Sequence, residues 1–294
     1  MDFSIYDSDQ TLSWSEIEDM RKGKQIELEP VYTEALVPVD KCGGLRLHVL
    51  GSGSKGNCCV IEGPEGALMI DAGFSKKVAF ERLDALKISR AKIKAILLTH
   101  EHSDHTKGLG VLSRGLQIPV YCTQGSSESR SVSKEVSPYI IHSRDSFDLA
   151  GIHIQTFPTS HDAREPIGFR FEGDGDAVSY VTDTGNLSAE AKELLSDARL
   201  LALESNHDPD MLKNGPYPYV LKQRIASETG HLSNVQAFEV LSTLISSRTQ
   251  TVIGMHLSET NNKPDMSIKT LLPGIGTSPI KVYAARQNRP ISYQ

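Results

Sequence analysis

The sequence of 294 residues contains few cysteines, and their spacing excludes two common uses of this residue. The four are Cys42, Cys58, Cys59 and Cys122, and no two of them form a C-x-x-C pair. The adjacent Cys58 and Cys59 are also poorly placed to bridge each other. The pattern argues against a disulfide framework and against a cysteine zinc site, and it predicts reduced thiols in an apolar setting.

The sequence also lacks long apolar runs and a recognisable leader. No run approaches the ~20 apolar residues that span a bilayer. The first ten residues, MDFSIYDSDQ, lack the basic and then apolar segments of a signal peptide. We therefore expect a cytoplasmic protein that has no membrane partner. The sequence does not indicate an oligomeric state.

The sequence also has fewer basic than acidic side chains. The net charge is −6, and residues 1–44 account for all of it with ten acidic and four basic side chains. Residues 45–294 therefore balance at zero, which excludes a broadly basic surface for nucleic acid. Any polyanion has to bind through a local basic cluster or through metal ions. We expect residues 1–44 to be an acidic N-terminal extension and residues 45–294 to form a single domain.

The stretch LGSGSKGNCCVIEG contains the G-x-G-x-x-G pattern of a dinucleotide-binding loop at Gly51, Gly53 and Gly56. Asp71 lies twenty residues after Gly51, where such a loop has its ribose-binding acid. That fingerprint requires a helix directly after the glycines. The following CCVIEGPEGALMIDAG instead has two apolar runs around a Pro/Gly turn, which predicts a β-hairpin. This context argues against a nucleotide cofactor.

Predicted strands alternate with predicted helices from residue 45 onward. The strands are at 45–50, 58–61, 67–70, 95–99, 120–122, 152–157, 168–172, 178–182, 200–204, 251–255 and 281–285. The helices are at 75–87, 187–197 and 233–247. The last two have good N-cap residues, Ser188 and Ser233. This pattern predicts an α/β protein with two sheets covered by helices.

The strongest chemical signal is the segment THEHSDH, which follows the apolar run at 95–98 and places His100, His102, Asp104 and His105 within six positions. Imidazole and carboxylate groups crowded at a strand end desolvate one another unless a cation gathers them. Together they are a ligand set for Zn²⁺, Mn²⁺ or Fe²⁺. The segment therefore predicts a divalent metal site.

Three further ligand candidates, His161, Asp183 and His256, each follow an apolar run. Taken singly, each has an ordinary alternative as a capped histidine or a turn aspartate. Ligands at the ends of several strands would, however, converge on one edge of the sheets. We therefore group these residues with the THEHSDH segment.

In this order, THEHSDH, SHD, TDTG and MHLSE resemble the metal motifs of the metallo-β-lactamase superfamily. The resemblance implies a four-layer αββα sandwich with two divalent metal ions, zinc, manganese or iron. It implies two ligand sets that share one residue: His100, His102 and His161 for one metal, Asp104, His105 and His256 for the other, and Asp183 as the bridge. Asp71, in MIDAG, matches the motif whose acid supports the ligand loop from behind.

Longer segments resemble the YycJ (WalJ) branch of this superfamily, whose members are described as double-stranded DNA 5′-to-3′ exonucleases. These segments are GSGSKGNCCVIE, THEHSDHTKGLGVL, SHDAREPIGF, ESNHDPDMLKNGPYPYVLKQRI, GHLSN and HLSETNN. The resemblance covers roughly residues 45–265. It implies that residues 45–294 are a catalytic domain that hydrolyses DNA phosphodiesters with a hydroxide held between two metals.

Two alternatives remain open at this point. The same site could hydrolyse a small phosphodiester or a cyclic nucleotide, or the chain could be a non-catalytic, metal-stabilised DNA-binding protein. A complete ligand set argues against the second alternative, because a vestigial site usually loses ligands. Fold alone does not decide the substrate.

Residues around the expected metals are candidates for catalysis and substrate binding. Asp104 would orient the hydroxide as well as bind metal, and His231 either protonates the leaving alkoxide or holds the ligand loop in place. Substrate-binding candidates offer hydrogen bonds or positive charge: Ser54, Asn57, Asn206, His207, Asn234, Lys213, Lys222 and Arg224. The last three lie beside Tyr217 and Tyr219, which predicts either a DNA-binding patch or an ordinary surface loop. The glycine loop either approaches the metals or a phosphate, or is a tight turn that needs positive φ.

Overall fold

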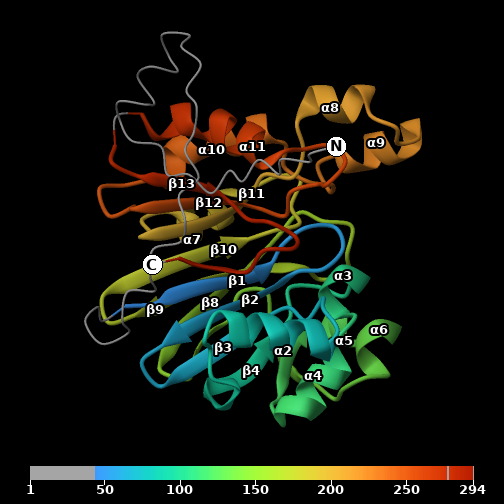
Figure 1. Cartoon of the computed structure of the whole chain (residues 1–294), viewed down its shortest axis with the longest axis vertical. Coiled ribbons are helices and arrows are strands. Elements are labelled where there is room, and N and C mark those ends of the chain that lie inside the picture. Colours follow the sequence, from blue (N-terminus) through green and yellow to red (C-terminus); the bar gives the residue numbers. More distant parts are fainter. Residues whose placement is uncertain (1–43, 277, 294) are drawn as a thin grey trace, which may run out of the picture.

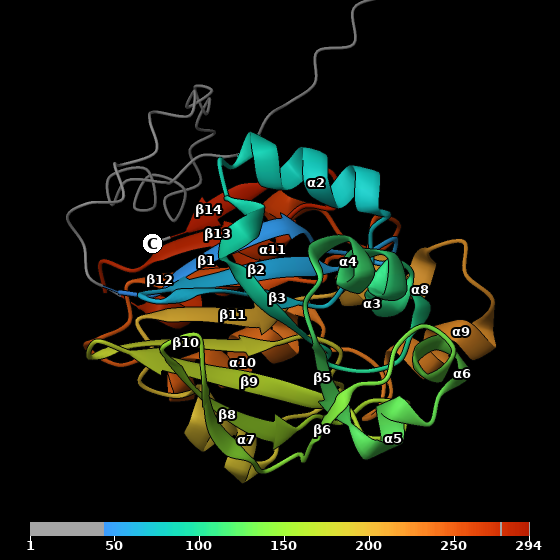
Figure 2. The same cartoon turned by 90° about the horizontal axis from the view of Figure 1, so that it is seen from below.

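The computed structural model describes residues 44–276 and 278–293. The predicted acidic extension lies outside these residues except for Gly44. Within them, the chain forms two seven-stranded sheets that pack face to face and carry helices on their outer faces (Figures 1 and 2). This is the αββα arrangement that the sequence motifs imply.

The first sheet has the strand order β14-β1-β2-β3-β4-β5-β6. Its strands are β1 (Arg46–Gly51), β2 (Cys58–Gly63), β3 (Gly66–Ile70), β4 (Ile93–Leu97), β5 (Val120–Thr123), β6 (Tyr139–Ile141) and β14 (Ile291–Tyr293). Strands β2 and β3 form the hairpin predicted after the glycine loop, with Gly63 paired to Gly66. A strand therefore occupies the place where a dinucleotide-binding fold needs a helix.

The second sheet has the strand order β13-β12-β11-β10-β9-β8-β7. Its strands are β7 (Ser146–Leu149), β8 (Ile152–Pro158), β9 (Ile167–Gly173), β10 (Asp176–Val181), β11 (Leu200–Glu204), β12 (Thr251–Met255) and β13 (Lys281–Ala284). Strands β10 to β13 are parallel neighbours, so their carboxyl ends lie at one edge of the sheet. The edge strands β6, β7 and β14 were not predicted, because three or four partly exposed residues leave little apolar pattern.

Helices cover both outer faces. They are α2 (Lys76–Ala85), α3 (Ser103–Thr106), α4 (Leu109–Leu116), α5 (Gln124–Ser127), α6 (Arg130–Ser133), α7 (Ala189–Leu195), α8 (Pro209–Asn214), α9 (Tyr219–Ile225), α10 (Asn234–Leu244) and α11 (Pro264–Leu271), with 3₁₀ turns η1 (Arg90–Lys92) and η2 (Leu272–Ile275). Ser188 and Ser233 cap α7 and α10 as predicted, because each hydroxyl accepts a hydrogen bond from the N–H group three residues later. At α10, Gln236 completes a capping box.

The main core lies between the two sheets and uses alternate residues of the facing strands. Leu68 and Ile70 of β3, and Phe169 and Phe171 of β9, are almost completely buried there. The intervening residues pack beneath the helices, where two further apolar clusters form. Strands buried on both faces explain the continuous apolar runs in the sequence.

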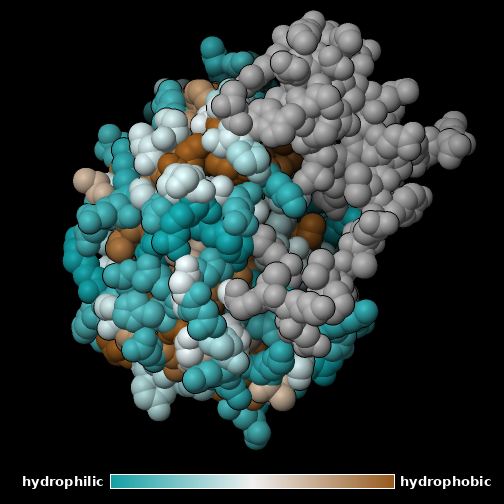
Figure 3. All heavy atoms as spheres, turned by 90° about the vertical axis from the view of Figure 1, so that its left-hand side faces the viewer, coloured by the Kyte–Doolittle hydropathy of each residue, from teal (hydrophilic) through white to brown (hydrophobic). Residues whose placement is uncertain are grey.

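The loops that carry the candidate ligands emerge at one end of the sandwich, near α3, α8 and α9 (Figure 1). Figure 3 shows the opposite end, where hydrophilic side chains cover most of the described surface and hydrophobic ones form small groups. Among the described residues, no helix has the length and apolar character needed to cross a membrane.

Candidate metal centre

The ends of several strands converge at this edge, as the sequence predicts. His100 and His161 follow β4 and β8, whereas Asp183 and His256 follow β10 and β12. Asp183 and His256 have positive φ values of 56° and 55°. Such left-handed conformations are uncommon outside glycine and cluster at functional sites. The chain therefore turns sharply where each of these two side chains enters the site.

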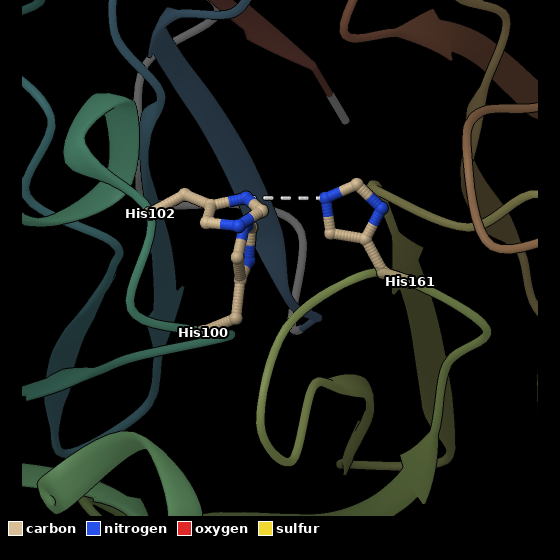
Figure 4. Close-up of side chains that lie close together, drawn as sticks. All are labelled: His100, His102 and His161. Carbon is tan, nitrogen blue, oxygen red and sulfur yellow. Dashed lines mark hydrogen bonds between the residues drawn. The ribbon is translucent and has the colours of Figure 1, made fainter. Parts of the chain in front are cut away.

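The first cluster contains His100, His102 and His161, with one nitrogen of each ring within 4.8 Å of the others. Figure 4 shows His102 and His161 pointing towards each other from separate loops, with Nδ1 of His102 3.2 Å from Nε2 of His161. Two nitrogen ligands of a tetrahedral zinc ion are about 3.4 Å apart, because each lies about 2.1 Å from the metal. The spacing of these two nitrogens therefore fits a shared metal.

The second cluster contains Asp104, His105 and His256, whose ligand atoms also lie within 4.8 Å of one another. Oδ2 of Asp104 is 3.4 Å from Nε2 of His105 and 3.5 Å from Nε2 of His256. Asp183 lies between the two clusters. Its Oδ2 is 3.3 Å from Nε2 of His105, and its Oδ1 is 3.7 Å from Nε2 of His161. One carboxylate thus reaches both clusters with different oxygens.

Buried acceptors determine which nitrogen faces the clusters in three of the histidines, His105, His161 and His256. Nδ1 of His105 donates to Oδ2 of Asp71 at 2.7 Å, and Nδ1 of His256 donates to Oε1 of Glu204 at 2.9 Å. Nδ1 of His161 donates to a backbone carbonyl at 3.0 Å. With the proton held on Nδ1, each Nε2 keeps its lone pair directed into the site, which is the arrangement that metal ligation requires.

Asp71 is completely buried behind the ligand loop. Besides His105, its carboxylate accepts hydrogen bonds from the backbone N–H group and the hydroxyl of Thr99, at 2.8 and 2.9 Å. Thr99 directly precedes His100, so Asp71 fixes the loop at two points. These are the contacts expected of an acid that supports the ligands, and they leave Asp71 facing histidine instead of a ribose.

The glycine loop approaches the ligand loop closely. The backbone N–H group of Asn57, directly after Gly56, donates to the backbone oxygen of Asp104 at 2.8 Å. Gly53 has a φ of 150°, a conformation that L side chains rarely adopt. Both explanations proposed for the glycine loop therefore apply at this edge: a conformation that favours glycine, and close backbone approach to the ligands.

The carboxylates of the site dominate its electrostatics. Burial lowers the pKa of a histidine, and at His100 it holds the pKa well below the ordinary value. At His256 burial also opposes the charged form, but Asp183, Asp104 and Glu204 overcome it and raise the pKa to about 10. Carboxylates that raise a buried imidazole pKa in this way attract cations in general, whether protons or metal ions.

Three buried ligand atoms have no hydrogen-bond partner among the described residues: Nε2 of His100, Nε2 of His256 and Oδ2 of Asp183. Buried polar atoms are nearly always paired, so each such atom requires an explanation. All three belong to the clusters, and imidazole with carboxylate is the donor set of divalent transition metals. The residues therefore fit a divalent metal site.

Glu204 is a site residue that was not predicted. It is completely buried at the end of β11, and its Oε1 accepts hydrogen bonds from Nδ1 of His231 at 2.8 Å as well as from His256. Its Oε2 accepts from the backbone N–H group of Thr184 at 2.8 Å. In the sequence it shares a position at a strand end, in ESNHD, with the predicted ligands, but this position alone does not single it out.

A cavity of about 240 Å³ opens over the two clusters. Four of the predicted catalytic and substrate-binding side chains line it together with the ligand candidates: Ser54, Asn206, Arg224 and His231. Asp104 also lines this cavity, so the two predicted catalytic side chains face the same space. Tyr217, Leu221 and Ile225 form an apolar part of its wall.

Three of the predicted substrate-binding residues, Asn57, Asn234 and His207, do not line this cavity. Asn57 and Asn234 are completely buried. Asn57 donates to Oδ2 of Asp104 at 3.2 Å, and Asn234 donates to Asn262 at 3.0 Å. His207 is 2% exposed, and burial lowers its pKa to about 4. These side chains therefore stabilise the loops behind the site.

The predicted basic patch folds as α8 and α9, and its charges are partly used within the protein. Arg224 donates to Oδ2 of Asp162 at 2.5 Å, and Nζ of Lys222 donates to the backbone oxygen of Lys213 at 2.7 Å. Neither Lys213 nor Lys222 lines the cavity. Asp162, which follows His161, was not predicted, and it makes this patch less positive than its sequence indicates.

Comparisons with known proteins agree with this geometry. The Beta-lactamase superfamily domain matches residues 67–257, and the chain therefore belongs to the metallo-β-lactamase superfamily. Within it, the chain is 35% identical over 228 residues to exodeoxyribonuclease YycJ of Bacillus anthracis, covering 76% of this chain and 86% of that protein. It is 33% identical over 235 residues to exodeoxyribonuclease WalJ of Streptococcus pneumoniae, covering 78% and 87%.

Solved structures show the same fold at low sequence identity. The metallo-β-lactamase fold protein YhfI of Bacillus subtilis aligns with a TM-score of 0.64 at 15% identity, covering 85% of this chain and 99% of that chain. Zn²⁺-bound PqqB of Methylobacterium extorquens aligns with a TM-score of 0.61 at 16% identity, covering 84% and 99%. At such identities, the likeness supports the fold and no finer conclusion.

Proposed function

We propose that this protein is a metal-dependent exodeoxyribonuclease that hydrolyses double-stranded DNA from the 5′ end. One observation carries the proposal. The carboxylate of Asp183 lies between two clusters of ligand-type side chains, and one open cavity lies over both clusters. The names of the relatives YycJ and WalJ support the substrate class. The complete clusters favour an enzyme over a non-catalytic DNA-binding protein.

In this proposal the site holds two divalent ions, for which zinc, manganese and iron are the candidates. His100, His102 and His161 would hold one ion, and Asp104, His105 and His256 would hold the other. Asp183 would be shared by both ions, and Asp71 supports the ligand loop. Bound metals supply Lewis-acid polarisation of the phosphate and a nucleophile at neutral pH. The Nδ1 hydrogen bonds described above orient the rings of His105, His161 and His256 so that Nε2 is the nitrogen available to a metal.

The side chains that face the cavity have separate tasks. Asp104 accepts a hydrogen bond from the attacking water and thereby orients it towards the phosphorus. Nδ1–H of His231 donates a hydrogen bond to Glu204, which leaves Nε2 as the nitrogen for proton transfer. When the ring carries a second proton, on Nε2, it can give that proton to the leaving oxygen and return to the neutral form. Ser54 and Asn206, which line the cavity, would donate hydrogen bonds to non-bridging phosphate oxygens.

Residues 45–294 form the catalytic domain in this proposal. The family match ends at residue 257, but β14 pairs with β1 and so completes the first sheet from the end of the chain. The C-terminal segment is therefore integral to the sandwich. The cytoplasmic location remains a prediction that rests on the sequence.

The test compares substrates and chain ends with one preparation of full-length, metal-loaded protein. Linear duplex DNA labelled at either 5′ or 3′ ends, covalently closed duplex DNA, a cyclic nucleotide and a bis-aryl phosphodiester are incubated in parallel. We expect early release of the 5′ label as mononucleotide from the linear duplex only. Rapid cyclic-nucleotide turnover with intact DNA would replace the proposal with a small-molecule phosphodiesterase.

A further inference from the structure

A second cavity of about 380 Å³ adjoins the metal centre, and Ser258 lines both cavities. It lies between the start of α11 and residues 285–289. Three cationic side chains line it, Lys263, Arg286 and Arg289. The acidic residue in its wall, Glu259, is paired with Lys55 at 2.6 Å. We call this the basic cavity, because positive charge is concentrated there although residues 45–294 balance at zero.

The sheet topology determines why this cavity lies beside the metals. Strands β12 and β13 are parallel neighbours, with Gly254 paired to Ala284. Residues 285–289 therefore leave the sheet at the same edge as His256, which follows β12. Lys263 is the N-cap residue of α11, so the positive end of the α11 helix dipole also faces this region.

The arginine-bearing segment is held firmly against the glycine loop. The buried Gln287 donates from Nε2 to the backbone oxygen of Gly56 at 2.7 Å, and its Oε1 accepts from the backbone N–H group of Lys55 at 2.8 Å. Its backbone oxygen accepts from Arg82 at 2.9 Å. The glycine loop also contacts the ligand loop, so the basic cavity has a fixed position relative to the metal centre.

We propose that the basic cavity binds a second phosphate group of the DNA strand, adjacent to the phosphate that is hydrolysed; this inference rests on the proposed function. Guanidinium groups bind phosphate oxygens with paired N–H donors, and a lysine adds a point charge. Asn288 and Ser258 add uncharged polar groups to the same wall. A terminal 5′ phosphate and an internal phosphate share this chemistry, and the experiment below distinguishes them.

The experiment uses the full-length, metal-loaded double variant Lys263→Gln/Arg289→Gln. The control variant, Lys77→Gln/Lys94→Gln, removes the same charge from exposed positions on α2 and β4 that line neither cavity. Each protein is assayed on linear duplex DNA over a range of salt concentrations and on a bis-aryl phosphodiester, which needs only the metal centre. The bis-aryl phosphodiester turnover and the thermal unfolding midpoint report whether each variant is folded.

We expect kcat/KM for duplex DNA to fall on the order of tenfold in the double variant, because charged hydrogen bonds to one phosphate are lost. The dependence of log affinity on log salt should flatten by about 0.9. Turnover of the bis-aryl phosphodiester should match wild type, and the control variant should match wild type in both assays. Lys263→Glu, a change at an exposed position, should reduce DNA turnover further than Lys263→Gln.

Comparing 5′-phosphorylated with 5′-hydroxyl duplexes locates the phosphate. If the double variant loses turnover only on 5′-phosphorylated duplexes, the terminal phosphate binds in the cavity. If it loses turnover equally on both kinds of duplex, an internal phosphate binds there.

Unchanged DNA turnover in the variants would overturn the inference and leave the proposed function intact. Increased turnover would also overturn it, because that result indicates that the cavity holds a competing acidic segment. Failure of the proposed function is seen separately, as wild-type protein that cleaves the bis-aryl phosphodiester and ignores DNA.

Discussion

Nδ1 of His231 lies 2.8 Å from Oε1 of Glu204, and the same oxygen accepts a hydrogen bond from His256 at 2.9 Å. One buried carboxylate therefore orients both the proposed proton donor and a proposed metal ligand. Burial alone would raise the pKa of Glu204, but the neighbouring histidines lower it to about 2, so the group remains an anion at neutral pH. Glu204 is thus a positioning residue that links the ligand cluster to the proton donor.

Replacing Glu204 with glutamine tests this role. The amide retains the shape of the carboxylate but loses its charge and one of its two acceptor oxygens. It can therefore no longer accept from both histidines and from the backbone N–H group of Thr184 together. We expect phosphodiester turnover or metal affinity to fall by about 10- to 100-fold, the usual effect of removing a partner of a metal-binding histidine. The matched control is Glu239→Gln at an exposed position on α10, which should leave both quantities unchanged. Normal metal content with normal turnover in Glu204→Gln would rule out the positioning role.

Asp183→Asn tests the bridging assignment. Because the two oxygens of Asp183 approach different clusters, the substitution should weaken binding at both metal positions. His102→Ala removes a ligand from the first cluster alone and should weaken metal binding at one position only. Titration of metal-free protein with Zn²⁺ in the presence of a competing chelator measures both affinities. Loss of a single equivalent in Asp183→Asn would show that the carboxylate serves one ion.

The pKa of His256 predicts how pH affects the metal-free protein. Its folded-state pKa of about 10 lies above the ordinary value of 6.5, so its contribution to stability is fully present below pH 6.5 and is lost as the pH rises through 10. We expect the unfolding temperature of chelator-treated protein to fall between pH 6.5 and 10. A bound metal replaces the proton, so the metal-loaded protein should not show this fall. Thermal unfolding with and without chelator measures the difference.

The buried thiols give a prediction that does not depend on metal. Cys58, Cys59 and Cys122 are free and buried, and burial raises their pKa values, that of Cys122 to about 12. Since the thiolate is the reactive form, these three residues should resist alkylation at pH 8 in folded protein and react after denaturation. Peptide mass mapping after iodoacetamide treatment measures the extent of alkylation at each cysteine. Cys42 lies outside the described residues and is not part of the prediction.

The clustering of the candidate ligands could be predicted from the sequence because the largest part of the set is local. His100, His102, Asp104 and His105 occupy one short loop, and the other ligands follow apolar runs whose strand character is clear. Glu204 has the same position at a strand end, but a single acid after a strand is common and carries no signal alone. The convergence of the candidate ligands is thus predictable from their positions in the sequence, whereas their division between two metals comes from the family resemblance and stays a prediction. The residue that orients His256 and His231 becomes visible only through its contacts.

Burial and long-range pairing account for what the sequence did not reveal. Asn57 and Asn234 have the chemistry of phosphate ligands, but neighbours distant in sequence enclose them completely. The positive charge of Arg224 is offset by Asp162, which lies 62 residues earlier. Lys263 and Arg289 reach one cavity because β12 and β13 are adjacent and parallel, a pairing that no local pattern specifies.

The most direct test of the central claim is a metal titration followed by activity. Metal-free, full-length protein is titrated with Mn²⁺ or Zn²⁺, and mononucleotide release from linear duplex DNA is measured at each point alongside metal bound per chain. The account predicts that activity is absent without metal and reaches its maximum at two bound equivalents per chain. Full activity at one equivalent, or activity that persists in the presence of excess chelator, would contradict a catalytic centre built on both clusters.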